Sequence, residues 1–591
     1  MDNDINKRLK SENIIWQLGD LYDGPATPQI DTDLHWCQKE AEALENSYKN
    51  RVSELTAGEL AKLVARLEKL STAKGRLSTF AFLYFTTQTQ NPEAAALLQK
   101  IREASSQTGK HTVFFELEWS AAPTAWADAI LDDDKLSPYH HYLATMRRYA
   151  PHLLSLPEES LLLEIAPVGR GSWTLLFDKI MGHLKFGARQ RTEEEVLTDL
   201  YDANREIRQQ AADDLTKGLK DNLHIFTHIT NNLLADKMID DRLRHYPDWL
   251  SAMNLYNELA GKTVQTLVDA VSGRYDIVSR YYNFKRDLLG LPELTDYDRY
   301  APLPHLPDQE ITWPDARDMV LRAFADFSPS MAEIAQMFFQ RQWIHAPILA
   351  GKRGGAFAHP CTPEVHPYVM VNYTGNMRDI STVAHELGHG VHQYLAAERG
   401  YYNSDTPLVL AETASVFAEL LLFNYQLNLL EDKRQRAAFI GQKLESIFAT
   451  VFRQTAMNRF EELSHNARRQ HGELGAEEIS KLWRSTQEEM FQGSVKLRRD
   501  YDIWWSYIPH FLNSPGYVYS YAFGELLVLA LYNLYKEQGE AFVPRYIELL
   551  KAGGSASPYE LLSPFGIDLN DKDFWLGGLT VIEEMVSKLG A

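Results

Sequence analysis

The sequence predicts a mainly α-helical protein with a small β-sheet. Two observations support this prediction. Long segments carry apolar residues at the spacing of an amphipathic helix, and segments with the residue types typical of strands are scarce. The chain has 591 residues, of which 45% are hydrophobic and 11% aromatic, so it can bury large cores. We therefore expect more than one domain.

Residues from about 35 to 155 show helical apolar spacing broken by short turns, which predicts antiparallel helices. Around 156–190 the segments become shorter and contain Gly and Pro, and long amphipathic helices resume with RTEEEVLTDLYDANREI. This change places a boundary near residue 195. We expect an N-terminal helical domain over 1–195 and a second domain, which carries the candidate site, over 196–591.

The composition excludes several classes of protein. The formal net charge is −20, from 80 acidic and 60 basic residues, which argues against nucleic acid and anionic membranes as partners. Two cysteines fit a reducing compartment, and apolar stretches such as LLVLALYNLY are shorter than the about 20 residues that span a bilayer. The amino terminus has no apolar core before a cleavage site, so we expect no secretory signal. We expect a soluble, cytoplasmic monomer or weak homodimer.

The segment TVAHELGHGVHQYLAAE suits a helix and contains His385 and His389 four residues apart. On a helix both imidazoles face the same way and can reach one Zn²⁺ at about 2.0–2.1 Å. Glu386 is then placed to take a proton from a water on that ion, which is the chemistry of a zinc peptidase. His392 lies about 10 Å along the axis from His385, too far to share the ion. The alternative is a helix with two solvated or core histidines.

A second helix is predicted from PLVLAETASVFAELLLFNYQLNLL. It is apolar on nearly every side, yet Glu412, Ser415 and Glu419 form one stripe at i, i+3 and i+7. Buried carboxylates need a cation or strong donors. We therefore expect Glu412 to be the third metal ligand and Glu419 to orient a ligand imidazole from behind. The alternative is a stripe that faces polar groups of the amino-terminal half.

Residues 366–373, HPYVMVNY, predict a strand just before the metal-binding helix. We expect an edge strand, in which Tyr368 and Val369 bind an extended peptide main chain to main chain. The run from Gly351 to Gly355 upstream predicts a flexible rim, with Gly355 also contacting the peptide.

HELGH followed by ETAS, with a Glu four residues beyond the Ser, resembles the signatures of the oligoendopeptidase F branch of the thimet oligopeptidase-like zinc metallopeptidases. GKRGGAFAHP, PYVMVNYTGN and IPHFLNSPGYVYSYAFG agree, and the similarity spans nearly the whole chain. The resemblance implies a two-part helical ellipsoid with a deep substrate channel, a small β-sheet beside the zinc helix, one Zn²⁺ per chain and cleavage of short unstructured peptides. The chain departs from the branch at Gly516, where we expect an aromatic residue.

The resemblance also implies that His510 and Tyr521 stabilise the negative charge that builds on the carbonyl oxygen during amide hydrolysis. Tyr517 and Tyr519 compete for this role and are expected to contact the peptide. In a helix that starts after Gly516, Tyr517 and Tyr521 share a face, whereas Tyr519 points elsewhere.

The predicted function is therefore a zinc metalloendopeptidase that cleaves short peptides through a metal-activated water. A zinc carboxypeptidase is the first alternative, and it needs a cation such as Lys352, Arg353 or Arg498 to hold a terminal carboxylate. A catalytically silent peptide-binding relative is the second, against which the intact Glu386 argues. A structural zinc site would need a fourth ligand such as Cys, which the nearby sequence does not supply.

Overall fold

The computed structural model describes residues 2–306 and 310–590, and the chain divides into two compact units of three segments each. Unit 1 contains residues 1–150, 308–429 and 534–567, and unit 2 contains residues 151–307, 430–533 and 568–591. These boundaries lie at positions other than residue 195, so the division into 1–195 and 196–591 stays a prediction. The mainly helical fold class with one small sheet is confirmed.

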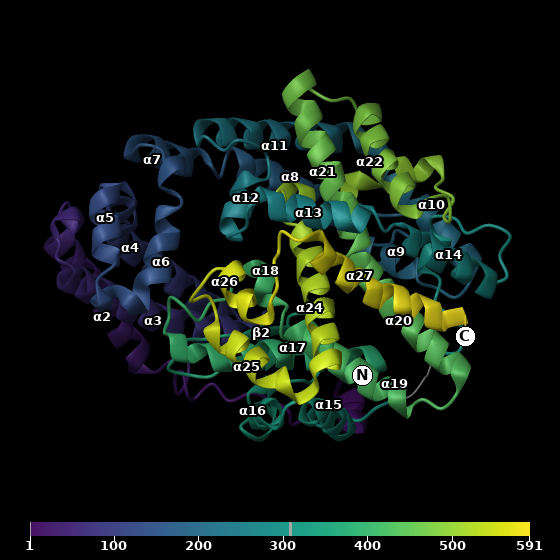
Figure 1. Ribbon diagram of the computed structural model, residues 1–591, viewed down its shortest axis with the longest axis horizontal. Helices are drawn as coiled ribbons and strands as arrows, with labels where there is room; N and C mark the ends of the chain where they lie inside the picture. The colour runs from purple at the N-terminus through teal and green to yellow at the C-terminus, as the bar shows by residue number, and fades with distance from the viewer. Residues whose placement is uncertain (1, 307–309, 591) are drawn as a thin grey trace. The chain divides into compact units, whose positions relative to one another are not determined.

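Unit 1 carries the sheet (Figure 1). Its helices are α1 (Asp2–Leu9), α2 (Pro28–Tyr48), α3 (Ala57–Thr86), α4 (Pro92–Ala121), α5 (Thr124–Leu131), α6 (His140–Arg147), α15 (Trp313–Phe327), α16 (Pro329–Gln340), α17 (Met377–Ala396), α18 (Leu408–Ala411), α19 (Ser415–Leu429), α25 (Val543–Ala552) and α26 (Pro558–Leu562). Its strands are β1 (Ile344–His345), β2 (Phe357–His359) and β3 (Tyr368–Met370).

The described residues of unit 2 form helices without a named strand. They are α7 (Leu156–Ile165), α8 (Arg170–His183), α9 (Glu193–Asp199), α10 (Arg205–Asp221), α11 (Leu223–Leu243), α12 (Ser251–Tyr256), α13 (Gly261–Ser272), α14 (Asp276–Leu288), α20 (Lys433–Thr450), α21 (Phe452–His471), α22 (Ala476–Phe491), α23 (His510–Asn513) and α27 (Lys572–Ser587). Helix α24 (Tyr519–Gln538) begins in unit 2, and its last residues are assigned to unit 1.

The helices predicted over residues 35–155 are present, and α2, α3 and α4 pack against one another (Figure 1). Helix α3 begins with a capping box, in which Thr56 and Glu59 each satisfy a main-chain N–H of the other. Leucines at helical spacing in α3 are buried, among them Leu60, Leu63 and Leu67. The apolar stripe seen in the sequence therefore forms the contact between these helices.

The sheet has the strand order β1-β3-β2, with β1 parallel and β2 antiparallel to β3. Val369 of β3 aligns with Ile344 on one side and Ala358 on the other. The strand predicted at the edge is therefore the central one, and that prediction is wrong. The two flanking strands are not recognisable in the sequence, because they have only two and three residues, too few to show the alternation of a strand.

The apolar segment predicted as one helix from Pro407 is interrupted, because α18 ends at Ala411 and α19 begins at Ser415. By length and composition the stretch Leu408–Leu429 could cross a membrane, but 67% of its most apolar window is buried inside the protein. Its Phe417 stacks on Tyr546 of α25, with ring centroids 4.5 Å apart. Packing within unit 1 thus accounts for its apolar character.

Candidate metal centre and active site

His385 and His389 lie on one face of α17, as their spacing predicts, with ring centroids 4.8 Å apart. The helix starts with a capping box between Asn376 and Asp379. Gly388, between the two histidines, sits against the segment that joins α18 to α19. A Cβ there would lie 2.6 Å from the carbonyl oxygen of Ala414, so only glycine lets the two backbones approach this closely.

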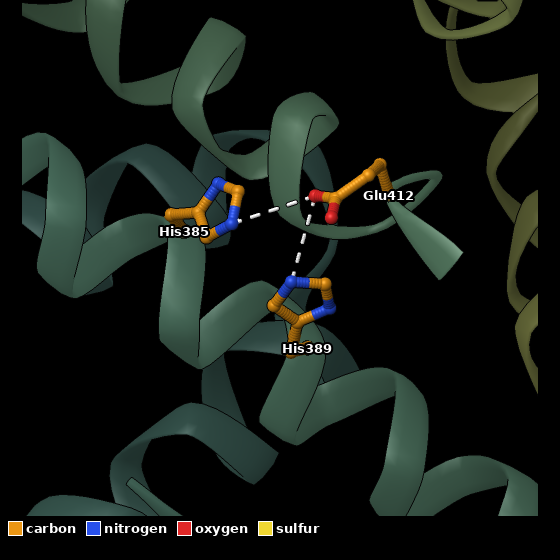
Figure 2. Close-up of side chains that lie close together, drawn as sticks. All are labelled: His385, His389 and Glu412. Atoms are coloured by element: carbon orange, nitrogen blue, oxygen red, sulfur yellow. Dashed lines mark ion pairs between the residues drawn. The ribbon is translucent and has the colours of Figure 1, made fainter. Parts of the chain in front are cut away.

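This close approach brings Glu412 to the two histidines. Its Oε2 lies 3.4 Å from Nε2 of His385 and 3.5 Å from Nε2 of His389. Dashed lines in Figure 2 mark these two contacts. The interruption of the helix places Glu412 in the turn between α18 and α19, with 39% of its side chain exposed. Ser415 Oγ donates a hydrogen bond of 2.6 Å to the same oxygen. The carboxylate is therefore held in place and still open to solvent.

Two of the three separations between the donor atoms match a tetrahedral zinc ion, and all three donor atoms lie within 4.8 Å of one another. Two atoms that each lie about 2.0–2.1 Å from such an ion are about 3.3–3.4 Å apart, which matches the two nitrogen-to-oxygen separations above. Within the described part of the chain, His385, His389 and Glu412 are the one group of three such side chains close enough to hold a metal. Three protein donors are what a catalytic zinc uses, because a fourth position stays open.

Glu419 lies behind His385, as predicted. Its Oε1 is 2.6 Å from Nδ1 of His385, on the side of the ring opposite Glu412. When Nδ1 carries the proton and donates it to Glu419, Nε2 keeps its lone pair and points it at the candidate metal position. The stripe of Glu412, Ser415 and Glu419 is thus explained by α17 rather than by polar groups elsewhere.

The ionisation of the site follows from burial and from its three carboxylates. Burial lowers the pKa of His385, but Glu419, Glu412 and Glu386 outweigh it and raise this pKa to about 9. At His389 burial prevails over Glu412, and the pKa falls to about 4. A bound cation would favour the neutral form of both rings, because a histidine ligand must be deprotonated.

Glu386 is only 7% exposed and faces the sheet. Burial raises the pKa of this carboxyl to about 7, against the opposing effects of His385 and of the nearby main chain of Ala358 in β2. A carboxylate that exchanges its proton near neutral pH suits general acid and base catalysis. The Ala358 carbonyl accepts a hydrogen bond from Gln393 Nε2 at 3.5 Å, which links β2 to α17. Sequence reasoning missed Ala358, because a main-chain group leaves no residue-type signal.

Of the residues predicted to contact the peptide, two lie buried in the sheet and one is exposed. Tyr368 and Val369 have no exposed surface, and they lie in the central strand, so they cannot pair with a peptide. Gly355 is exposed, with φ of +80°, but the loop around it is tied down: Asn372 Nδ2 donates to the carbonyls of Arg353 and Gly355. The prediction of a flexible rim is therefore not supported by these contacts.

His510, Tyr517 and Tyr521 gather in unit 2. The Tyr521 hydroxyl lies 3.4 Å from Nε2 of His510, and the rings of Tyr517 and Tyr521 meet edge to face with centroids 5.0 Å apart. Tyr519 points elsewhere, as predicted: it is 1% exposed, and its hydroxyl accepts Asn257 Nδ2 at 2.8 Å. The prediction that Tyr519 contacts the peptide is wrong, because its ring belongs to the core of unit 2.

Gly516 shapes the loop that precedes these tyrosines. Its φ is +79°, and a Cβ would lie 2.7 Å from Cδ1 of Leu250. Its N–H donates to Oε1 of the buried Glu461 at 3.0 Å. The aromatic residue expected at this position is therefore excluded by the backbone conformation and by Leu250.

Two of the three cations considered for a carboxypeptidase are otherwise engaged. Lys352 Nζ donates to three main-chain carbonyls at 2.6–3.2 Å. Arg498 pairs with Asp296 and Asp213 within unit 2. Arg353 is exposed, with its guanidinium 5.8 Å from the ring centroid of Phe82. Only Arg353 keeps a guanidinium that could hold a terminal carboxylate.

The class of protein that this fold and these side chains define is a metalloendopeptidase. The sequence pattern of Peptidase family M3 matches residues 199–580, and the pattern named Oligopeptidase F matches residues 118–186. The chain therefore belongs to peptidase family M3, and the predicted resemblance is confirmed.

Relatives and solved structures agree over almost the full length. Oligopeptidase PepF of Bacillus subtilis is 27% identical over 98% of this chain and 87% of its own. An oligoendopeptidase F homolog of Lactococcus lactis is 24% identical over 99% and 98%. The crystal structure of oligoendopeptidase F from Enterococcus faecium, 21% identical, has a TM-score of 0.72 and covers 95% of this chain and 98% of its own. A protein from Chlamydophila abortus, 23% identical, reaches 0.87 with 98% of both chains covered.

Proposed function

We propose that this protein is a zinc-dependent endopeptidase that hydrolyses short, unstructured peptides. The observation that carries the proposal is the convergence of His385, His389 and Glu412, with Glu386 next to them on α17. One zinc ion per chain, held by the two Nε2 atoms and the Glu412 carboxylate, would polarise a peptide carbonyl and lower the pKa of a water molecule. The printed names of the relatives, oligopeptidase and oligoendopeptidase, support peptides as substrates.

The chain's own groups move the protons and hold the charge. Glu386 takes a proton from the attacking water at a carboxylate oxygen and delivers it to the nitrogen of the leaving amine. Glu419 keeps the His385 ring in one tautomer throughout. We propose that His510 and Tyr521 donate to the carbonyl oxygen as it becomes negative. No covalent intermediate with the protein is needed.

The proposed setting is the cytoplasm, with a monomer or weak homodimer acting on peptides rather than on nucleic acid or membranes. The net charge of −20 and the two free cysteines, Cys37 and Cys361, support this. The carboxypeptidase alternative is less favoured, because Lys352 and Arg498 are already bound to other groups.

A mixed peptide library tests the endopeptidase proposal. We expect internal bonds of short peptides to be cut, and native globular proteins to stay intact, because the predicted channel admits an extended chain but not a folded domain. Mass spectrometry of the products over time is the measurement. Products that shorten by one residue at a time from the carboxyl end would favour the carboxypeptidase, and cleavage of folded proteins at internal loops would contradict the channel.

Tyr521→Phe should lower kcat by about 10²–10³-fold with little change in KM, the range typical for loss of one donor to a developing oxyanion. Steady-state kinetics on one defined peptide measure this. Tyr519→Phe is the matched control, because it removes a hydroxyl that is bonded to Asn257 in the core. A large loss of kcat in Tyr519→Phe together with a silent Tyr521→Phe would move the donor role to another tyrosine.

A further inference from the structure

Unit 2 contains a cavity between α14, α20, α21 and α22, beside Arg299 and Tyr300. It leaves about 70 Å³ for the centres of water-sized molecules, several times the about 10–15 Å³ that one water needs. Tyr201, which is 60% exposed, lies on its rim. Much of the wall is apolar and comes from Val278, Phe448, Phe452, Met490 and Phe491.

Two arginines line this cavity without a counter-charge. Arg299 is only 6% exposed, and its Nε has no acceptor, although its Nη2 donates to the Tyr300 hydroxyl. The Nε of Arg453, on α21, is also buried without an acceptor. Among the described residues, no carboxylate forms an ion pair with either guanidinium. Two other arginines of unit 2 do have a counter-charge, since Arg208 pairs with Asp298 and Arg498 with Asp296.

The other charged groups at the cavity do not neutralise the two guanidinium groups. Glu445 lines the wall, but its Oε1 already accepts the ammonium of the buried Lys285 and the hydroxyl of Tyr281. Burial raises the pKa of Tyr282 and Tyr201, which line the cavity, so these phenols are protonated and neutral at neutral pH.

Aromatic rings stabilise part of the positive charge of Arg299. The Arg299 guanidinium lies 4.4 Å from the ring centroid of Tyr300 and 5.2 Å from that of Tyr501. Such cation–π contacts offset only part of what it costs to desolvate an ion in a protein interior. An anion in the cavity would supply the missing counter-charge, and guanidinium groups bind carboxylate and phosphate oxygens well.

We propose that this cavity is an anion-binding site in which Arg299 and Arg453 hold a carboxylate or phosphate group, with the aromatic wall taking the apolar part of the ligand. A free small anion and the terminal carboxylate of a peptide share this chemistry. The second source rests on the proposed peptidase function. It is supported by the position of His510, the candidate oxyanion donor, in the same unit as the cavity.

Thermal unfolding in matched ionic strength tests the site, with benzoate, benzamide and inorganic phosphate as probes. Benzoate and phosphate should raise the Tm of the wild type by at least about 2 °C, and the neutral benzamide should not. Arg453→Met keeps the length of the stem without the charge and should lose this response. Arg434→Met, on the exposed first turn of α20, should keep it and controls for net charge and for general effects of phosphate.

An equal response in Arg453→Met and the wild type, or no response of the wild type to either anion, would overturn the proposal. In anion-free buffer Arg453→Met should melt no lower than the wild type, because an unpaired buried charge does not stabilise the fold. If that variant fails to fold, Arg453→Lys replaces it. Arg453→Lys should lose at least half of the rise in Tm, since an ammonium group replaces the planar guanidinium with its several N–H donors. A full rise in Tm would contradict the assignment of Arg453 to the anion site.

The source of the anion is decided in the Glu386→Gln background, where turnover is expected to be about 10²–10⁴-fold slower. Calorimetry compares one peptide that ends in a free carboxylate with the same peptide ending in an amide. An acid form that binds at least about tenfold tighter, with the difference erased by Arg453→Met, assigns the site to the peptide terminus. Equal binding with the benzoate response intact assigns it to a free anion. If the protein cleaves no peptide at all, the benzoate and phosphate measurements still stand.

Discussion

Glu386→Gln should lower kcat by about 10²–10⁴-fold while the protein keeps its fold and its zinc content. The amide has nearly the shape of the carboxylate but cannot take the proton of an attacking water. The side chain is 7% exposed, and the amide oxygen can still accept hydrogen bonds as the carboxylate does. Single-turnover kinetics on one peptide, with metal content measured on the same sample, separate the loss of the base from a loss of zinc.

The matched control is Glu398→Gln, which changes an exposed carboxylate just beyond the end of α17. It should leave kcat within about twofold of the wild type, as expected for a surface change far from the reaction. Peptide hydrolysis by Glu386→Gln at a rate close to the wild type would show that another group is the base. Loss of zinc in the same variant would show instead that Glu386 supports the metal site.

The three candidate metal ligands could be predicted because each rests on local geometry. His385 and His389 are four apart on one helix, and Glu412 stands out as a carboxylate in an otherwise apolar segment. The interruption of the helix between Ala411 and Ser415 could not be predicted, since nothing in VLAETASV breaks a helix. It accompanies the close approach of this segment to Gly388, which is a tertiary contact.

The sheet and the division into units could not be read from the sequence for a related reason. Strand β2 consists of Phe357–His359, and a three-residue strand has no period to detect. Likewise, residues 534–567 belong to unit 1 although they are far from it in the chain. Tyr546 in this segment donates its hydroxyl to the carbonyl of Thr413, next to Glu412. Contacts between such distant residues leave no mark on local composition.

The departure at Gly516 shows what a resemblance can and cannot supply. The family pattern pointed to the segment that holds His510, Tyr517 and Tyr521, and these side chains do lie together in unit 2. It did not indicate that the backbone at Gly516 has a positive φ and is held by Glu461. A change from the expected aromatic to glycine is thus linked to the conformation of this loop.

Removal of the metal should abolish peptide hydrolysis, and added Zn²⁺ should restore it. Glu412→Ala should also abolish hydrolysis, because it removes one of the three metal donors. The removed carboxylate oxygen lies 3.4–3.5 Å from the Nε2 atoms of His385 and His389, the two donors that remain. We expect this variant to bind zinc at least about 10²-fold more weakly, since loss of a direct ligand should exceed the about 10–100-fold cost of losing a supporting group.

Zinc content after dialysis against a metal buffer measures the zinc affinity of Glu412→Ala independently of activity. Glu431→Ala, which removes an exposed carboxylate beyond α19, is the control and should retain full zinc. Full zinc occupancy in Glu412→Ala would remove Glu412 from the ligand set and would require another residue to complete the site.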